Sequence, residues 1–226
     1  MWCIKFFRIF ALMGMVFHLH AQNPTPRFLE SQFMISNKFS NVYTANLGLS
    51  SRMVFNEVEN SLPIIFVNLS HFSSFRIANN SHLGLGVMYR FADAFEDQSF
   101  NEFRLTQQFY TIFKPSVIRY AHRFRMEERF IGSDTFMRLR YRMGIDFPLN
   151  GQALDLKEAY ALFNVESLLQ LNRNQSPRVD FRISGGVGVL ITPKLKLQGI
   201  LQHRFEHLTQ IQEGRWFGFL GGYIKI

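Results

Sequence analysis

Hydrophobic and polar residues alternate along most of this chain, most clearly between residues 135 and 147. One set of alternate positions carries the charged residues Arg138, Arg140, Arg142 and Asp146. The other set is apolar, with Met137, Leu139, Tyr141, Met143, Ile145 and Phe147. Successive side chains of an extended strand point to opposite faces. This segment therefore predicts a strand with one charged face and one apolar face.

The same alternation recurs in segments separated by short turn-forming stretches such as Gly132 to Asp134 and Thr192 to Lys194. The predicted strands are residues 28–37, 41–53, 63–74, 82–91, 101–113, 117–130, 135–147, 159–172, 179–191, 194–207 and 215–226. Regular short strands joined by turns are typical of an all-β sandwich or an up-and-down barrel. No linker or composition shift divides them, which predicts a single domain.

Alternation alone does not decide which face meets which solvent. A soluble barrel buries its apolar face, whereas a membrane barrel turns that face to lipid and lines its lumen with polar side chains. Most of the 26 phenylalanines lie in the strand region, and the polar face uses arginine far more than lysine. The strands are also longer than the about 5–6 residues usual in soluble proteins. We therefore predict an antiparallel, up-and-down, transmembrane β-barrel.

The strand number follows from where the two chain ends are expected to lie. Eleven segments are visible, but an even number is needed if both ends face the same side of the membrane. We therefore expect about 12 strands, with an additional strand hidden in residues 22–53, and 10 strands as the alternative. The last strand, which stops on its apolar set at Ile226, resembles the insertion signal of bacterial outer-membrane barrels.

The first 21 residues predict a cleaved signal peptide, which leaves residues 22–226 as the barrel domain. Lys5 and Arg8 precede a short apolar stretch, and Ala21 is a suitable cleavage point. The one cysteine, Cys3, lies in this segment, so the mature chain offers no disulfide or thiolate site. The segment holds 2 of the 25 basic residues and none of the 17 acidic ones, leaving a net charge of +6. Because these charges are spaced singly along strands, nucleic-acid binding is not expected.

The polar faces together predict an arginine-rich network inside the barrel. Its members are Arg104, Arg119, Arg123, Arg125, Arg129, Arg138, Arg140, Arg142, Arg182 and Arg204, with Glu102, Glu127, Asp146, Glu166, Asp180 and Glu206. Guanidinium groups pair bidentately with carboxylates, so the network could be a salt-bridged filling that keeps the barrel rigid. The excess of arginine also allows a path or binding site for small anions. Glu166 is expected to project toward Arg140 or its neighbours.

Catalytic and metal-binding signals are weak. His71 and Ser73 share one strand face, as a histidine base and serine nucleophile would, but Leu83, Leu85 and Val87 occupy the neighbouring face where an orienting group should lie. His122 and His203 are expected in an aromatic belt rather than as metal ligands. No phosphate-binding loop, dinucleotide fingerprint or nucleophile elbow is present. We expect no enzyme activity, cofactor or metal.

Several segments resemble one exported barrel family, known as domain of unknown function 2490. They are the runs Arg123 to Phe130 and Arg138 to Arg142, the strand with Asn164 and Glu166, and the glycine-rich last strand. The resemblance implies an outer-membrane barrel and supplies no catalytic residues. We therefore expect a bacterial outer-membrane barrel that contacts membrane lipid and is either structural or a narrow anion-favouring pore. The alternatives are an outer-membrane lipid-modifying enzyme and a soluble periplasmic lipid-binding barrel.

Overall fold

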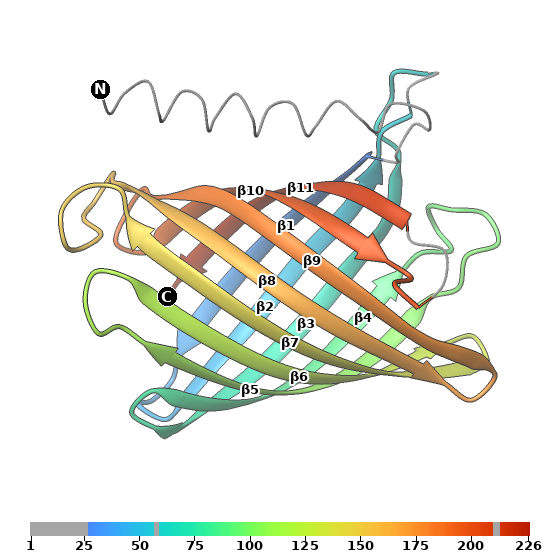
Figure 1. Ribbon diagram of the computed structural model, residues 1–226, viewed down its shortest axis with the longest axis horizontal. Coiled ribbons are helices and arrows are strands. Elements are labelled where there is room, and N and C mark those ends of the chain that lie inside the picture. The colour runs from blue at the N-terminus through green and yellow to red at the C-terminus, as the bar shows by residue number, and fades with distance from the viewer. Residues whose placement is uncertain (1–26, 57–58, 210–212) are drawn as a thin grey trace.

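The strands form one closed barrel. The computed structural model describes residues 27–56, 59–209 and 213–226. Their eleven strands are β1 (Arg27–Lys38), β2 (Tyr43–Val54), β3 (Ile64–Ala78), β4 (Ser81–Phe91), β5 (Glu102–Phe113), β6 (Arg119–Ile131), β7 (Asp134–Pro148), β8 (Ala159–Asn172), β9 (Gln175–Leu190), β10 (Leu195–Glu206) and β11 (Glu213–Lys225). Each strand pairs with its neighbours in sequence, and β1 closes the sheet against β11 (Figure 1). The predicted signal peptide, residues 1–21, lies outside the described residues.

Each of the eleven segments predicted from alternation forms one strand, which confirms the all-β prediction. The hairpin between β6 and β7 shows how the sequence sets the turns. Gly132 adopts a φ of 55°, a left-handed conformation that costs glycine little because it has no Cβ. Glycine at the first position of a two-residue turn matches the twist of the flanking strands. Within the described ranges, no helix is long and apolar enough to cross a membrane.

The barrel has close to the predicted number of strands but differs in its closing pair. The described residues form eleven strands, one fewer than the expected 12, because residues 27–54 form two strands rather than three. Sequential pairs are antiparallel, but β1 and β11 are parallel, with Arg27 opposite Trp216 and Ser36 opposite Lys225. A parallel closing pair places the start of β1 and the end of β11 at opposite ends of the barrel. The even-number expectation assumed both on one side, and this premise was wrong.

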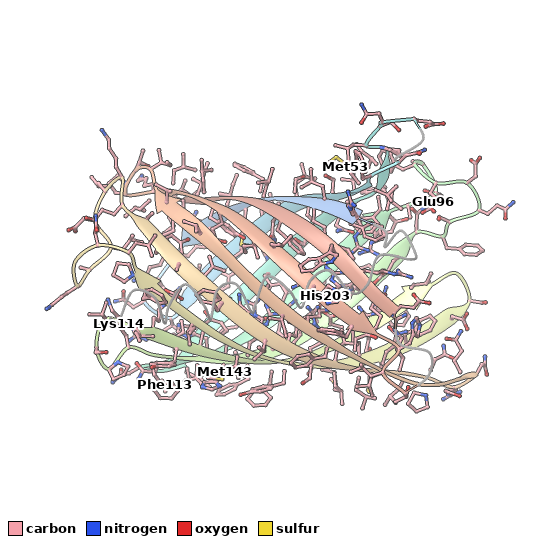
Figure 2. The ribbon with its side chains drawn as sticks, turned by 45° about the horizontal axis from the view of Figure 1, so that its top comes forward. Met53, Glu96, Phe113, Lys114, Met143 and His203 are labelled. Carbon is pink, nitrogen blue, oxygen red and sulfur yellow. The ribbon has the colours of Figure 1, made fainter. Side chains whose placement is uncertain are left out.

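The apolar faces point outward and the charged faces point inward. Leu85, Leu139 and Leu201 have 58%, 41% and 57% of their surface exposed, whereas Glu127 is 0% exposed. Met53 and Met143 carry outward-facing side chains on different sides of the barrel (Figure 2). An apolar exterior around a polar interior is the arrangement of a transmembrane barrel and the reverse of a soluble one. The predicted fold, a transmembrane-type β-barrel, is thereby confirmed.

Glu96 and Lys114 lie at opposite ends of the barrel (Figure 2), and we call these the Glu96 end and the Lys114 end. The Glu96 end carries the connections that follow the even-numbered strands, and the Lys114 end carries those that follow β1, β3, β5, β7 and β9. Aromatic clusters flank the apolar band near both ends. Near the Glu96 end, the ring centroids of His203 and Trp216 are 4.5 Å apart. Near the Lys114 end, His122 Nδ1 and the Tyr141 hydroxyl share a hydrogen bond of 2.9 Å. Such girdles are typical of membrane interfaces.

Candidate functional site

The register of β6 and β7 brings arginines face to face inside the barrel. Arg123 lies opposite Arg142, and Arg125 lies opposite Arg140. Like charges opposite each other on neighbouring strands destabilise a sheet. The wall formed by these two strands can therefore be stable only if other groups offset the repulsion. Three buried carboxylates, Glu102, Glu127 and Glu166, do so, and we call them the central carboxylates.

Glu127 is the most deeply buried of the central carboxylates. Its Oε1 accepts a hydrogen bond of 2.8 Å from Arg140 Nη1 and lies 3.5 Å from Arg125 Nη1. Its Oε2 lies 3.6 Å from Arg104 Nη1. One carboxylate thus joins guanidinium groups from β5, β6 and β7. Hydrogen bonds between charged groups are stronger than neutral ones, and burial strengthens them further.

Glu166 makes the contact that the sequence predicted. Its Oε1 accepts hydrogen bonds from Arg140 Nη2 at 2.6 Å and from Arg182 Nη1 at 3.4 Å. Its Oε2 accepts one from Arg123 Nη2 at 3.0 Å. Arg140 is therefore held between Glu166 and Glu127. This bridging guanidinium connects two of the central carboxylates into one network.

Glu102 forms the third centre, near the Glu96 end. Arg129 donates to it in bidentate geometry, with Nε–Oε1 at 2.6 Å and Nη2–Oε2 at 2.7 Å. Arg104 Nη2 donates to Oε1 at 2.6 Å, and Arg90 Nη1 lies 3.3 Å from Oε2. Arg104 also contacts Glu127, so the network continues from Glu102 to Glu166.

The other charged residues expected in the network lie closer to the two ends. Arg119 pairs with Asp146 at 2.8 Å at the Lys114 end, and 44% of its side chain is exposed. Toward the Glu96 end, Arg178 Nε donates to Asp180 at 2.8 Å, and its Nη2 lies 3.2 Å from Glu206. Arg178 was not among the predicted residues, although it has the same strand parity as Asp180 and Arg182.

Two predicted arginines have no carboxylate partner among the described residues. Arg138 donates from Nε to the Gln170 side-chain oxygen at 3.1 Å, and its Nη2 donates to the same atom. Arg142 makes no ion pair with any described residue, although Glu166 lies opposite it in the β7–β8 register. The seven guanidinium groups paired with the central carboxylates and these two unpaired ones give the middle of the lumen a large excess of positive charge.

A separate ion pair spans the seam where the barrel closes. Glu30 on β1 accepts hydrogen bonds from Arg52 Nη2 at 2.6 Å and from Arg204 Nη2 at 3.0 Å. Arg204 belongs to β10, so its side chain reaches over β11 to meet Glu30. We call the contact between Arg204 and Glu30 the seam ion pair. Arg204 was predicted from the sequence but Glu30 was not, because hydrophobic and polar residues alternate less regularly in the first strand than in the other strands.

Aromatic rings inside the lumen offset part of the excess positive charge. The sequence did not lead us to predict aromatic rings on the lumen side. The Phe66 ring lies 3.6 Å from the Arg90 guanidinium carbon, and the Phe217 ring lies 3.4 Å from that of Arg204. Cations are attracted to the faces of aromatic rings. Phe66 shares its strand face with Asn68 and Ser70, so strict alternation could have placed this phenylalanine in the lumen.

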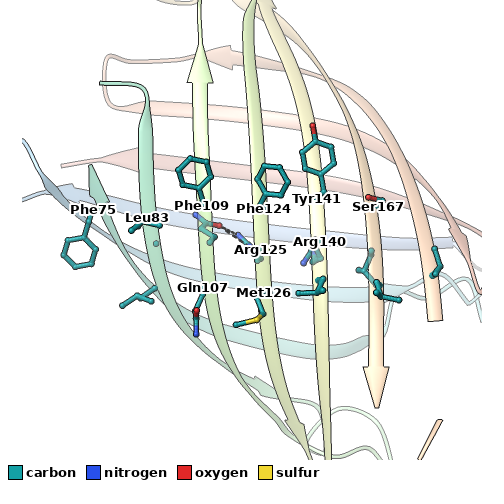
Figure 3. Close-up of a pocket in the computed structure, with 17 residues that line it drawn as sticks. Phe75, Leu83, Gln107, Phe109, Phe124, Arg125, Met126, Arg140, Tyr141 and Ser167 are labelled. Carbon is teal, nitrogen blue, oxygen red and sulfur yellow. Dashed lines mark hydrogen bonds between the residues drawn. The ribbon is translucent and has the colours of Figure 1, made fainter. Parts of the chain in front are cut away.

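The outer wall carries a broad apolar groove of about 840 Å³. Phe109, Phe124 and Tyr141 stand side by side on β5, β6 and β7 (Figure 3). Arg125 Nη2 donates to Gln108 Oε1 at 2.7 Å, and both side chains belong to the inner faces of their strands. The groove therefore belongs to the lipid-facing surface, while the charged chemistry lies behind it.

His71 and Ser73 do meet on the outer face of β3. His71 Nε2 and Ser73 Oγ are 3.1 Å apart, and the Tyr43 hydroxyl lies 3.1 Å from the same Oγ. The positions opposite His71 are Leu47 and Val87, which cannot orient an imidazole. The pair is thus formed without the third group that a catalytic triad uses. In the described residues, no group of three or more His, Cys, Asp or Glu side chains is arranged to hold a metal ion.

The fold and the lumen define a class: a transmembrane-type β-barrel with an arginine-rich interior. The chain belongs to the family described as "Protein of unknown function (DUF2490)", which it matches over residues 30–214. No curated protein matches it. Among solved structures it is similar to the siderophore receptor PirA from Pseudomonas aeruginosa, with a TM-score of 0.35 and 10% identity over 80% of this chain and 35% of the receptor. The chain thus spans about a third of that receptor's length.

Proposed function

We propose that this protein is a bacterial outer-membrane barrel without enzyme activity, whose lumen is a narrow path that favours anions. One observation carries the proposal: the central carboxylates are hidden, and the guanidinium groups paired with them are more accessible. Arg125 keeps 19% of its side chain exposed while its partner Glu127 keeps 0%, and Arg123 keeps 17% against 6% for Glu166. An ion in the lumen therefore meets positive charge, which attracts anions and repels cations.

The test is ion current through the purified mature protein in a planar bilayer under a potassium chloride gradient. We expect a reversal potential with the sign set by chloride. Arg138→Gln should weaken that preference, because it removes one positive charge without leaving a carboxylate unpaired. Arg173→Gln, in the turn between β8 and β9, is the matched control and should change selectivity little. A current that prefers potassium would contradict the proposal. A current no larger than that of the lipid alone would also contradict it and would indicate that the arginine network only fills the lumen.

A lipid-modifying activity is the second candidate, favoured by the His71–Ser73 contact of 3.1 Å. A serine activated by a neighbouring imidazole can attack an ester carbonyl. The discriminating assay is ester hydrolysis by purified protein that has been briefly heated to remove contaminating esterases. Ser73→Ala is compared with Ser70→Ala, which alters the lumen side of the same strand. Hydrolysis lost only in Ser73→Ala would establish the enzyme, whereas equal background in all three proteins supports the non-enzymatic proposal.

A further inference from the structure

A second cavity lies inside the lumen toward the Lys114 end, and its charged lining is entirely basic. Its volume is about 330 Å³, and it is lined by Arg119, Arg123, Arg125 and Arg142. Among the described residues, no aspartate or glutamate lines it. We call this cavity the basic chamber.

Small residues at lumen positions create the space. Ala121 on β6 lies opposite Gly144 on β7, and both line the basic chamber together with Gly48 on β2. A Cβ at Gly144 would lie 2.5 Å from the Asn164 side-chain oxygen, so no larger residue fits there without a shift. The neighbouring lumen positions carry long arginines. The chamber is thus formed by the sequence pattern itself, with small residues at its floor and guanidinium groups around it.

The chamber contains donor groups that lack partners. Arg142 forms no ion pair within 4 Å of any described residue, although Glu166 lies opposite it and attracts its charge, and the buried Nε of Arg123 has no hydrogen-bond partner. A buried charged donor without an acceptor is costly. These two arginines also lie opposite each other, so their repulsion adds to the cost. An anion placed between these two arginines would accept hydrogen bonds from their unpartnered N–H groups, and its negative charge would offset the repulsion between the guanidinium groups.

We propose that the basic chamber is a binding site for a small oxyanion of the phosphate class. The proposal deepens the anion-favouring lumen proposed above and rests on it. Guanidinium forks match the paired oxygens of phosphate better than a spherical chloride ion. Asn164 also lines the chamber and carries a neutral amide that could donate to the anion, whereas the amide of Asn46, another lining residue, already donates to the Phe72 carbonyl. The volume equals the liquid share of roughly ten waters, which suits one phosphate with part of its hydration shell.

Binding of radiolabelled inorganic phosphate to the mature barrel in phosphate-free detergent tests the site by equilibrium dialysis. We expect saturable binding to the wild-type protein and an affinity about tenfold or more lower in Arg142→Gln, which loses charge-assisted hydrogen bonds. Arg173→Gln removes the same charge at the opposite end of the barrel and should bind as the wild type does. Ala121→Leu fills the chamber without changing its charge and should also reduce binding. Unboiled gel mobility establishes that each variant is folded.

Equal binding by wild type, Arg142→Gln and Ala121→Leu, or no saturable binding by the wild type, would overturn the site. A parallel titration with dihexanoyl phosphatidic acid separates a free anion from a lipid headgroup, since both carry phosphate. If this lipid displaced phosphate at a far lower concentration, the site would serve lipid and the proposal would be wrong. Because dialysis needs no ion flow, phosphate binding without bilayer current would refute the pore and leave the site standing. Anion-selective current without phosphate binding would do the opposite.

Discussion

Two sectors of the barrel share an outer surface and differ inside. From β5 to β9, the inner wall carries the central carboxylates and all of their arginines except Arg90, which lies on β4. From β1 to β4, most of the inner wall is neutral, with short contacts such as Ser31–Ser51 at 2.7 Å and Asn68–Ser50 at 2.9 Å. Both sectors turn leucines outward, for example Leu49 and Leu139 at 52% and 41% exposure. The outer face is apolar in both sectors because all of it contacts the same apolar surroundings. On the inner wall, each polar side chain needs hydrogen-bond or ion-pair partners among the side chains next to it.

The neutral sector fills its space with an aromatic ring in place of ion pairs. Phe72 lies on the lumen face of β3 against two glycines of β4, and a Cβ at Gly86 would collide with its ring. The guanidinium carbon of Arg125 lies 5.3 Å from the same ring. The two sectors therefore meet where an arginine of the charged wall lies against the aromatic ring of the neutral one.

The largest expected difference between the sectors comes from removing a central carboxylate. Glu166→Ala leaves Arg123, Arg140 and Arg182 close together without their shared acceptor. Breaking one partner of a buried ion pair can cost about 3–5 kcal/mol. We expect a markedly lower thermal midpoint, measured as the temperature at which the detergent-solubilised barrel loses its unboiled gel mobility. An unchanged midpoint would show that the charged sector does not depend on Glu166.

Placing an arginine on the outer face should cost the same in both sectors. An arginine facing lipid at the bilayer midplane costs about 2–4 kcal/mol. We expect Leu139→Arg and Leu49→Arg to impair membrane assembly to a similar degree, measured as the fraction of heat-modifiable barrel in the membrane. A strong effect at only one of the two positions would mean that the outer face is not uniform.

Filling the space next to Phe72 should destabilise the neutral sector. Gly86→Ala forces a methyl group into the ring, and overpacking of this kind costs about 1–3 kcal/mol. Adding Phe72→Leu makes room and should recover part of the lost stability. Thermal midpoints of the two single variants and the double variant measure the coupling. Strictly additive effects would show that the ring and the glycine are not in contact.

The smallest expected effect comes from the short polar contacts of the neutral sector. Ser31 and Ser51 share one neutral hydrogen bond, with 2.7 Å between their side-chain oxygens. Net contributions of single neutral hydrogen bonds are about 0.5–1.5 kcal/mol. Ser31→Ala should therefore lower the free energy of unfolding, measured in urea, by much less than Glu166→Ala. A loss as large as that of Glu166→Ala would erase the distinction between the sectors.

Alternation was sufficient to predict the strands, the outward leucines and the arginines opposite one another on β6 and β7, because each depends on local parity and simple hairpins. It also predicted Glu166 as a partner of Arg140 or its neighbours, but it could not predict the other partners of those arginines. The contact of Arg123 with Glu166 skips β7, and that of Arg204 with Glu30 depends on how the barrel closes. Phe72 was not predicted to face the lumen, although it has the same strand parity as Asn68 and Ser70. The strand number depended on an assumption about topology that no local pattern contains.

The parallel seam has a consequence for the order in which the barrel assembles. β1 and β11 are the strands furthest apart along the chain, so bringing them together has the largest loop-closure entropy. Such non-local contacts generally form late, and parallel pairs are slightly weaker per residue than antiparallel ones. Since Arg204 reaches Glu30 only across β11, the seam ion pair can form only once the sheet has become a cylinder. That contact therefore stabilises the finished barrel without stabilising the open sheet that precedes it.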